Sequence, residues 1–271
     1  MRAWHTLCTL VLNDEYVMSI VLYGHRLSQP CRAVEILLRE LDTPYTWQTI
    51  DFANGETQEP WYAERINTFE TVPALVATTA QDEAGHELHL GESHAILRYL
   101  CRGAPRSASA GTWYPGDHDP VRAARIDQWL DWHHANIRRH DMFHHIMNLH
   151  LTLPMLKREI QATLLKPLQD RLRPGLARLE HQLGRNDGTD GASPYLCDDD
   201  TPSIADLAIA CELHQLVAVG YRFDRFPALR RWLEALGARP HFRDVSQAIS
   251  EQGRTIRAQD GNHLDLTGAF G

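Results

Sequence analysis

Short apolar runs and helical stripes alternate through the first hundred residues. The β-branched and aromatic run at 20–23 is typical of a buried strand. Apolar residues then recur at helical spacing up to Leu41, which predicts a helix whose first turn accepts Pro30. Further along, the pattern predicts a strand at 46–52, a short helix at 59–65, a hairpin from 74–77 and 88–90, and a helix at 93–101. The periodicity alone therefore predicts an α/β domain.

The second half of the chain shows helical periodicity only. Asp119-Pro120 is a suitable helix start, and apolar residues follow at helical spacing up to Ile137. A long helix is predicted over 157–183, where Pro167 and Pro174 predict kinks or breaks. Ser203 and Asp206 have the spacing of a capping box ahead of a buried helix. This half is predicted to be all-helical.

These patterns divide the chain into five parts. We expect an N-terminal extension at 1–17, an α/β domain at 18–103, a linker rich in Ala, Ser, Gly and Pro at 104–118, an all-helical domain at 119–250 and a polar tail at 251–271. The extension imitates a signal peptide poorly, because no small-residue cleavage site follows its apolar stretch.

The composition of the chain argues against nucleic acid and membranes as binding partners. The net charge of −8 argues against nucleic acid, which needs clustered Lys and Arg. No apolar run approaches the length that spans a bilayer, so no membrane partner is predicted. The five cysteines are scattered and none has CxxC spacing, which favours a reduced, cytoplasmic protein.

Three short stretches carry the candidate chemistry. They are Ser28-Gln29-Pro30-Cys31-Arg32-Ala33, Val72-Pro73-Ala74-Leu75 and Glu92-Ser93-His94-Ala95-Ile96. The first offers a hydroxyl at a helix start, the second a backbone edge before a proline, and the third a carboxylate and a hydroxyl at another helix start. In this order they resemble the glutathione pocket of theta-like, serine-type glutathione S-transferases.

The resemblance covers residues 20 to 248 and implies the fold and the ligand. It implies an α/β thioredoxin-like N-terminal domain followed by an all-α C-terminal helical domain. Glutathione would be the co-substrate, with an electrophilic small molecule as its partner in the reaction, and the protein would be a homodimer.

The family pattern also implies a role for each motif. Ser28 would hold the glutathione thiolate, because a hydrogen bond to sulfur favours its charged form. The main chain at Val72, before a cis Pro73, would pair with the backbone of glutathione. Glu92 and Ser93 would bind the γ-glutamyl group. The alternatives are helix capping by Ser28, Glu92 and Ser93, and an ordinary trans proline.

Two further positions complete the candidate site. Asp127 resembles the family's acidic residue that reaches the γ-glutamyl group across a dimer interface; the alternative is an exposed helix charge. The family's usual basic residue for the glycyl carboxylate is missing, so Gln58 is the candidate there, with Thr57 as the alternative. The candidate sources of positive charge are Arg26, Arg122 and Arg125.

Two competing types of site are weaker. Cys31 lies where a thioredoxin-type motif has its second cysteine, but the first is absent, so we expect a small buried residue. Histidines cluster between positions 133 and 150, yet no ligand set completes a metal site, and no metal is predicted. More simply, these histidines line the cleft or lie on the surface.

The function that follows is conjugation of glutathione thiolate to an electrophilic, apolar co-substrate. One alternative is glutathione-dependent dehalogenation of small haloalkanes, which theta-like relatives also perform. A second alternative is a non-catalytic binding protein that keeps the fold.

Overall fold

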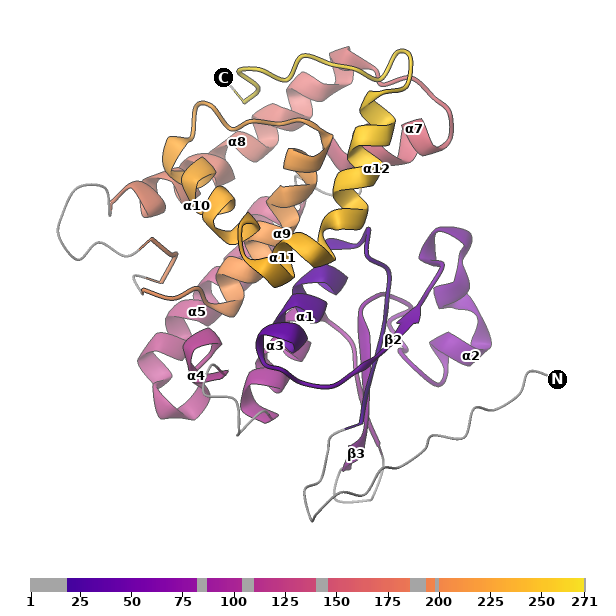
Figure 1. Cartoon of the computed structure of the whole chain (residues 1–271), viewed down its shortest axis with the longest axis vertical. Coiled ribbons are helices and arrows are strands. Elements are labelled where there is room, and N and C mark those ends of the chain that lie inside the picture. Colours follow the sequence, from indigo (N-terminus) through magenta and orange to yellow (C-terminus); the bar gives the residue numbers. More distant parts are fainter. Residues whose placement is uncertain are drawn as a thin grey trace.

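A four-stranded mixed sheet organises the first domain. The computed structural model describes residues 19–81, 87–103, 110–139, 146–185, 194–197 and 200–270. The strand order is β2-β1-β3-β4; β1 pairs parallel with β2 and antiparallel with β3, and β3 pairs antiparallel with β4 (Figure 1). The strands are β1 (Ile20–Gly24), β2 (Thr46–Thr49), β3 (Ala74–Gln81) and β4 (Glu87–Leu90).

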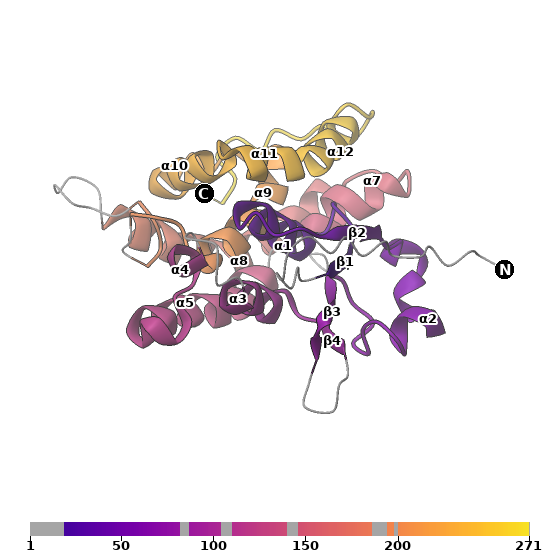
Figure 2. The same cartoon turned by 60° about the horizontal axis from the view of Figure 1, so that its bottom comes forward.

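Alternation along the strands sends side chains to two cores. Leu22 and Leu75 join the main core with α1 (Gln29–Glu40) and α3 (Ser93–Gly103). Ala74 joins a smaller cluster on the side of α2 (Pro60–Ala63). Figure 2 shows α1 and α3 on one side of the strands and α2 on the other. Successive side chains of a strand point to opposite faces of the sheet, so each face is covered by helices that pack on it.

The second domain is helical and is built around α9 (Ile204–Val219). This helix is buried along almost its whole length and packs against α1, α5, α10 and α12. The other α-helices described in this half are α4 (Ala110–Trp113), α5 (Pro120–His133), α7 (Leu153–Met155), α8 (Ala162–Gly184), α10 (Pro227–Gly237), α11 (Pro240–Val245) and α12 (Gln247–Arg257). Short 3-10 turns occupy Phe52–Asn54, Glu56–Gln58 and Gly116–His118, and π-helical segments occupy His134–Arg138 and Asn148–Thr152.

The predicted capping box is confirmed at the start of α9. The Ser203 hydroxyl accepts from the amides of Ala205 and Asp206, while the Asp206 carboxylate accepts from the Ser203 amide at 2.9 Å. Asp206 also accepts from the Leu196 amide and the Trp232 indole, both at 3.0 Å. One buried carboxylate therefore joins three segments of the helical domain.

The predicted fold class, a thioredoxin-like α/β domain followed by an all-α domain, is confirmed, and some elements differ in extent. The second strand ends at Thr49, because a 3-10 turn capped by Asp51 begins at Phe52. Helix α8 runs unbroken through Pro167 and Pro174, so a break at either proline is wrong, while a kink there stays a prediction. Burial of Leu172, Leu176 and Leu179 stabilises α8 and offsets the hydrogen bonds lost at the prolines.

The end of the chain is more structured than a polar tail. Helix α12 continues past residue 250 to Arg257, and the Phe270 ring stacks on Phe223 at 5.7 Å with an interplanar angle of 3°. The expected extension at 1–17 lies outside the described residues, and the five-part division of the chain stays a prediction. Within the described part of the chain, no helix is long and apolar enough to cross a membrane.

We expect Asp206→Ala to lower the free energy of unfolding by about 3 kcal/mol, because it leaves four buried donors without their acceptor: the Leu196 and Ser203 amides, the Ser203 hydroxyl and the Trp232 indole. Urea unfolding at a fixed protein concentration measures the change. The matched control is Asp224→Ala, which removes only an exposed ion pair with Arg230 and should cost well under about 1 kcal/mol. Equal losses in the two variants would contradict this account.

Two buried histidines predict a pH dependence of stability. Burial lowers the pKa of His150 and of His214 to about 4, so both rings stay neutral in the folded protein where the unfolded chain binds protons. Stability should therefore fall as the pH drops from about 6.5 to 4, by up to roughly 3 kcal/mol for each ring. In urea unfolding across this range, His150→Gln should flatten the slope, whereas the exposed His118→Gln should not.

Candidate functional site

The register of the sheet brings the three loops that carry the motifs to the same end of the strands. Tyr23, near the end of β1, lies opposite Ala74 at the start of β3, and Leu75 lies opposite Leu90 at the end of β4. Ser28 follows β1, Val72-Pro73 precedes β3, and Glu92-Ser93 follows β4. The three motifs therefore meet at the same end of the sheet, as their order along the chain predicts.

Ser28 is the N-cap residue of α1. Its φ and ψ are −81° and 121°, its carbonyl accepts the first helical hydrogen bond from Arg32 at 3.1 Å, and its side chain makes no cap hydrogen bond. The hydroxyl instead hydrogen-bonds the Cys31 thiol, whose burial raises its pKa to about 11. Ser28 is 5% exposed, and its hydroxyl is not used for capping, which was the alternative role.

Cys31 is a small buried residue beneath this loop. It is fully buried, and a Cβ on Gly24 would lie 2.9 Å from its sulfur, so the strand end and the helix start approach closely. The raised pKa keeps the thiol neutral at neutral pH. Both observations agree with the packing role expected for Cys31.

The loop before Ser28 is held from the helical domain. The fully buried Arg32 donates to the carbonyls of Arg26 and Leu27 and, across the domain boundary, to that of Cys211 at 2.9 Å. Gln215 on α9 also donates to the Leu27 carbonyl, at 2.8 Å. The backbone that presents Ser28 is thus fixed by hydrogen bonds from two helices.

The expected cis peptide bond between Val72 and Pro73 is confirmed. The preceding residue is anchored twice: the Tyr62 hydroxyl and the Asn67 amide donate to the Thr71 carbonyl at 2.6 and 2.9 Å. Val72 is half-buried beside the cluster of Tyr62 and Ala74. Pairing of the Val72 main chain with glutathione stays a prediction.

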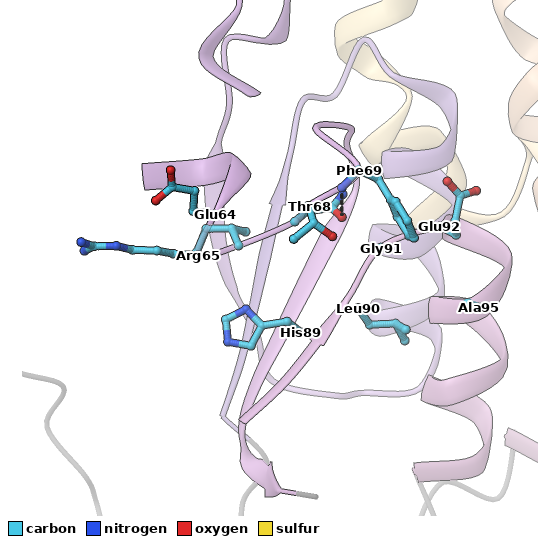
Figure 3. Close-up of a pocket in the computed structure, with 11 residues that line it drawn as sticks. Glu64, Arg65, Thr68, Phe69, His89, Leu90, Gly91, Glu92 and Ala95 are labelled. Carbon is cyan, nitrogen blue, oxygen red and sulfur yellow. Dashed lines mark hydrogen bonds between the residues drawn. The ribbon is translucent and has the colours of Figure 1, made fainter. Parts of the chain in front are cut away.

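Glu92 adopts a left-handed conformation where α3 begins. Its φ is +60°, an uncommon value for a residue other than glycine, and its side chain is exposed. The turn also needs Gly91, because a Cβ there would lie 2.8 Å from Asn67 Oδ1. Glu92 lines an open pocket of about 490 Å³ between the 64–69 loop and β4, with the Phe69 ring beside it (Figure 3).

A second, smaller pocket also lies at the start of α3. Ser93 lines it together with residues from four other segments: Pro30, Ala33, His133, His134, Arg138, Ala208 and Glu212, and His94 lies beside Ser93. The pocket therefore joins the first turns of α1 and α3 to the helical domain. Ser28 immediately precedes Gln29 and Pro30, so this pocket adjoins the predicted thiol position.

The histidines of this pocket form a packed group. His94 Nε2 lies 3.2 Å from His133 Nδ1, and the rings of His94 and His134 are 4.3 Å apart. Burial, with the positive charge of neighbouring histidines and arginines, strongly lowers the pKa of His94, so its ring is neutral at neutral pH. No group of three metal-ligating side chains occurs among the described residues, and His140, His144 and His145 lie outside them.

Two predicted site residues lie away from the pockets, and one of them, Asp127, has other partners in this structure. Asp127 accepts from Arg98 at 2.6 Å and from the Tyr114 hydroxyl at 3.1 Å, within the same chain. Gln58 is exposed in a 3-10 turn that follows β2. Both roles in glutathione binding stay predictions, since neither residue lines the two pockets described above.

The arginines considered for the missing charge are engaged or exposed elsewhere. Arg26 pairs with Glu35 at 2.9 Å, Arg122 donates to the carbonyls of Gly111 and Thr112, and Arg125 is exposed on α5. An arginine that does line the small pocket is Arg138, in the π-helical segment after α5. Sequence reasoning missed it because no motif marks the end of that helix.

Gly175 on α8 permits the path of the π-helical segment. A Cβ at this position would lie 2.7 Å from the Asn136 carbonyl oxygen, so only glycine allows the two backbones to approach this closely. Such π segments inside helices often accompany functional sites. The position of Arg138 therefore depends on a glycine in another helix.

Two family models match the chain. One is described as the glutathione S-transferase N-terminal domain and matches residues 22–108, and the other as the glutathione S-transferase C-terminal domain and matches residues 115–235. Together they span both halves of the structure.

Individual proteins are similar over most of the chain. Glutathione S-transferase T1 of Arabidopsis thaliana is 31% identical over 241 residues, covering 86% of this chain and 90% of that protein. Glutathione S-transferase theta-1 of Homo sapiens is 30% identical over 264 residues, covering 92% and 94%.

Solved structures share the fold. Human glutathione transferase theta-2 in complex with glutathione superposes with a TM-score of 0.69 at 23% identity, covering 88% of this chain and 90% of that one. An epsilon-class glutathione S-transferase from the housefly, Musca domestica, gives 0.69 at 23% identity, covering 89% and 98%. With the family models and the theta relatives, these likenesses show that the chain belongs to the glutathione S-transferase family and is theta-like.

Proposed function

We propose that this protein conjugates the glutathione thiolate to an electrophilic, apolar co-substrate. The observation that carries the proposal is the meeting of Ser28, Val72-Pro73 and Glu92-Ser93 at one edge of the sheet. This edge offers a hydroxyl for sulfur, a main-chain segment for the peptide backbone and a helix start for a carboxylate. Those are the groups that a tripeptide thiol presents.

In this mechanism Ser28 stabilises the thiolate without acting as a base. In the structure the Ser28 hydroxyl hydrogen-bonds the Cys31 sulfur, a contact that favours the thiolate form of that cysteine. With glutathione bound, the hydroxyl donates a hydrogen bond to the glutathione sulfur instead. The thiol proton leaves to solvent, and the start of α1 adds a favourable partial charge. A hydrogen bond to the charged form of a group lowers its pKa.

The reaction itself is a substitution at carbon. The thiolate sulfur donates an electron pair to the electrophilic carbon, the C–S bond forms, and the leaving group departs with the electrons of its former bond. Glu92 holds the ammonium of the γ-glutamyl group, Ser93 holds its carboxylate, and Val72 pairs with the cysteinyl backbone. Gln58 is the proposed donor to the glycyl carboxylate.

Assembly and location belong to the same proposal. A homodimer would present α3 and α5 to a second copy, with Asp127 and its partner Arg98 on that face. A cytoplasmic, reducing location agrees with the free thiols of Cys31, Cys101, Cys197 and Cys211.

We expect Ser28→Ala to lower kcat/KM for conjugation to a halonitroarene by at least about tenfold, roughly 1.4 kcal/mol of transition-state stabilisation, because the thiolate loses its hydrogen bond. Steady-state kinetics measure the change, with Ser250→Ala on α12 as the control. An unchanged rate in Ser28→Ala would favour a non-catalytic binding protein. Halide release from dichloromethane would identify a dehalogenase instead.

Glutathione binding should depend on Glu92. In isothermal titration, Glu92→Ala should weaken binding by about tenfold, because a charge-assisted hydrogen bond contributes about 1.5 kcal/mol or more. The matched control is Glu64→Ala, which removes a carboxylate from the other wall of the same open pocket. If both variants weaken binding equally, the effect is general electrostatics and the subsite is misplaced.

A further inference from the structure

A buried carboxylate joins the loop between β1 and α1 to the helical domain. This loop, residues 25–28, ends at Ser28 and is called the thiol loop below. Glu212, in the middle of α9, is 1% exposed. Its Oε1 accepts from Gln29 Nε2 at 3.0 Å, and its Oε2 accepts from Arg138 at 3.2 Å. His133 Nε2 lies 3.4 Å from the same Oε2. Three segments of the chain thus meet at one side chain.

The charge of Glu212 is kept by its partners. Burial on its own would raise the pKa of this carboxyl, but Arg138, His133 and Gln29 outweigh burial and hold the pKa below its ordinary value. A buried charge is costly when a partner is removed. The geometry of these three partners is therefore tied to the ionised carboxylate.

One arm of this network reaches the thiol loop. Gln29 directly follows Ser28, and its side-chain oxygen accepts from Gln215 at 3.1 Å while its amide donates to Glu212. Gln215 in turn donates to the Leu27 carbonyl. Both neighbours of Ser28 along the chain are therefore held by α9.

The other arm orients a cation. The Arg138 side chain is 34% exposed, lines the small pocket with Pro30 and Ser93, and is held at one end by Glu212. Burial raises the pKa of Cys31, three residues beyond Ser28, and the charge of Arg138 is one of the groups that act against burial there, after Ser28, the His25 main chain and Arg32. A thiolate held at Ser28 would be exposed to the same charge.

We infer that Glu212 is a positioning residue for the thiol site: it fixes Arg138 and the Gln29 end of α1 so that a cation and the Ser28 hydroxyl face the same sulfur. Glu212 itself does not touch the substrate. The inference rests on the proposed function and adds to it the residue through which the helical domain sets the acidity of the bound thiol.

The test measures ionisation of bound glutathione. At saturating glutathione, the ultraviolet absorbance of the thiolate is followed against pH for wild type, Glu212→Gln, Arg138→Met and the double variant. We expect Glu212→Gln to lower the acid dissociation constant of the bound thiol about tenfold, and to add less than about twofold in the Arg138→Met background, because coupled residues do not act additively.

Asp206→Asn is the matched control for a merely structural effect. It makes the same change of acid to amide at a buried position of the same helix, but Asp206 contacts neither Gln29 nor Arg138. We expect Asp206→Asn to lower the melting temperature and to leave the acid dissociation constant of the bound thiol within about twofold of the wild-type value. Equal shifts in Asp206→Asn and Glu212→Gln, or independent effects in the double variant, overturn the inference.

Two outcomes keep the inference separate from the proposed function. If wild type shows no bound thiolate, the proposed function fails and the inference fails with it. If wild type shows the thiolate but Glu212→Gln does not shift it, the inference alone fails. Should Glu212→Gln not fold, Arg138→Met still decides, because its guanidinium is partly exposed and an unchanged dissociation constant in this variant overturns the inference.

Discussion

The register between β1 and β3 is the constraint on which the site depends. With Tyr23 opposite Ala74, the end of β1 lies beside the start of β3. This pairing brings the loop that carries Ser28 and the Val72-Pro73 step to the same end of the sheet. A slip of one residue would turn every side chain of the strand to the other face of the sheet. The same pairing that buries Leu22 and Leu75 beneath α1 and α3 therefore also assembles the candidate pocket.

Polar contacts fix how the helical domain meets the sheet domain. Apolar side chains alone tolerate small shifts of one helix along another, whereas a buried hydrogen bond is lost when its partners move. Arg32, Gln215 and Glu212 each make such bonds across the boundary between α1 and α9. The helical domain consequently has one defined position against the thiol loop.

The sequence predicts the parts that carry local signals. The apolar run of β1, the proline at the start of α1 and the Ser203–Asp206 spacing each predict an element that the structure contains. The cis bond before Pro73 was predicted from the family resemblance, because no periodic pattern in the sequence indicates it. Local signals fail where packing decides, as in α8, which continues through Pro167 and Pro174.

Arg138 and Glu212 show why part of the site lay beyond sequence reasoning. They are 74 positions apart, and Glu212 sits among apolar residues of a helix without an amphipathic pattern. Only the tertiary fold brings the two charges together. A sequence motif consists of residues at short, fixed spacing, so two residues this far apart in the chain form no motif.

The contact between Gly175 and the backbone of Asn136 bears on how this protein tolerates sequence drift. Most exposed positions of α8 can vary freely, but a methyl group at 175 would meet the Asn136 carbonyl oxygen at 2.7 Å and push the π-helical segment away. Arg138 lies two residues further along that segment. Natural variation at residue 175 is therefore expected to act like variation in the candidate site, although the residue lines none of the pockets described above and no motif marks it.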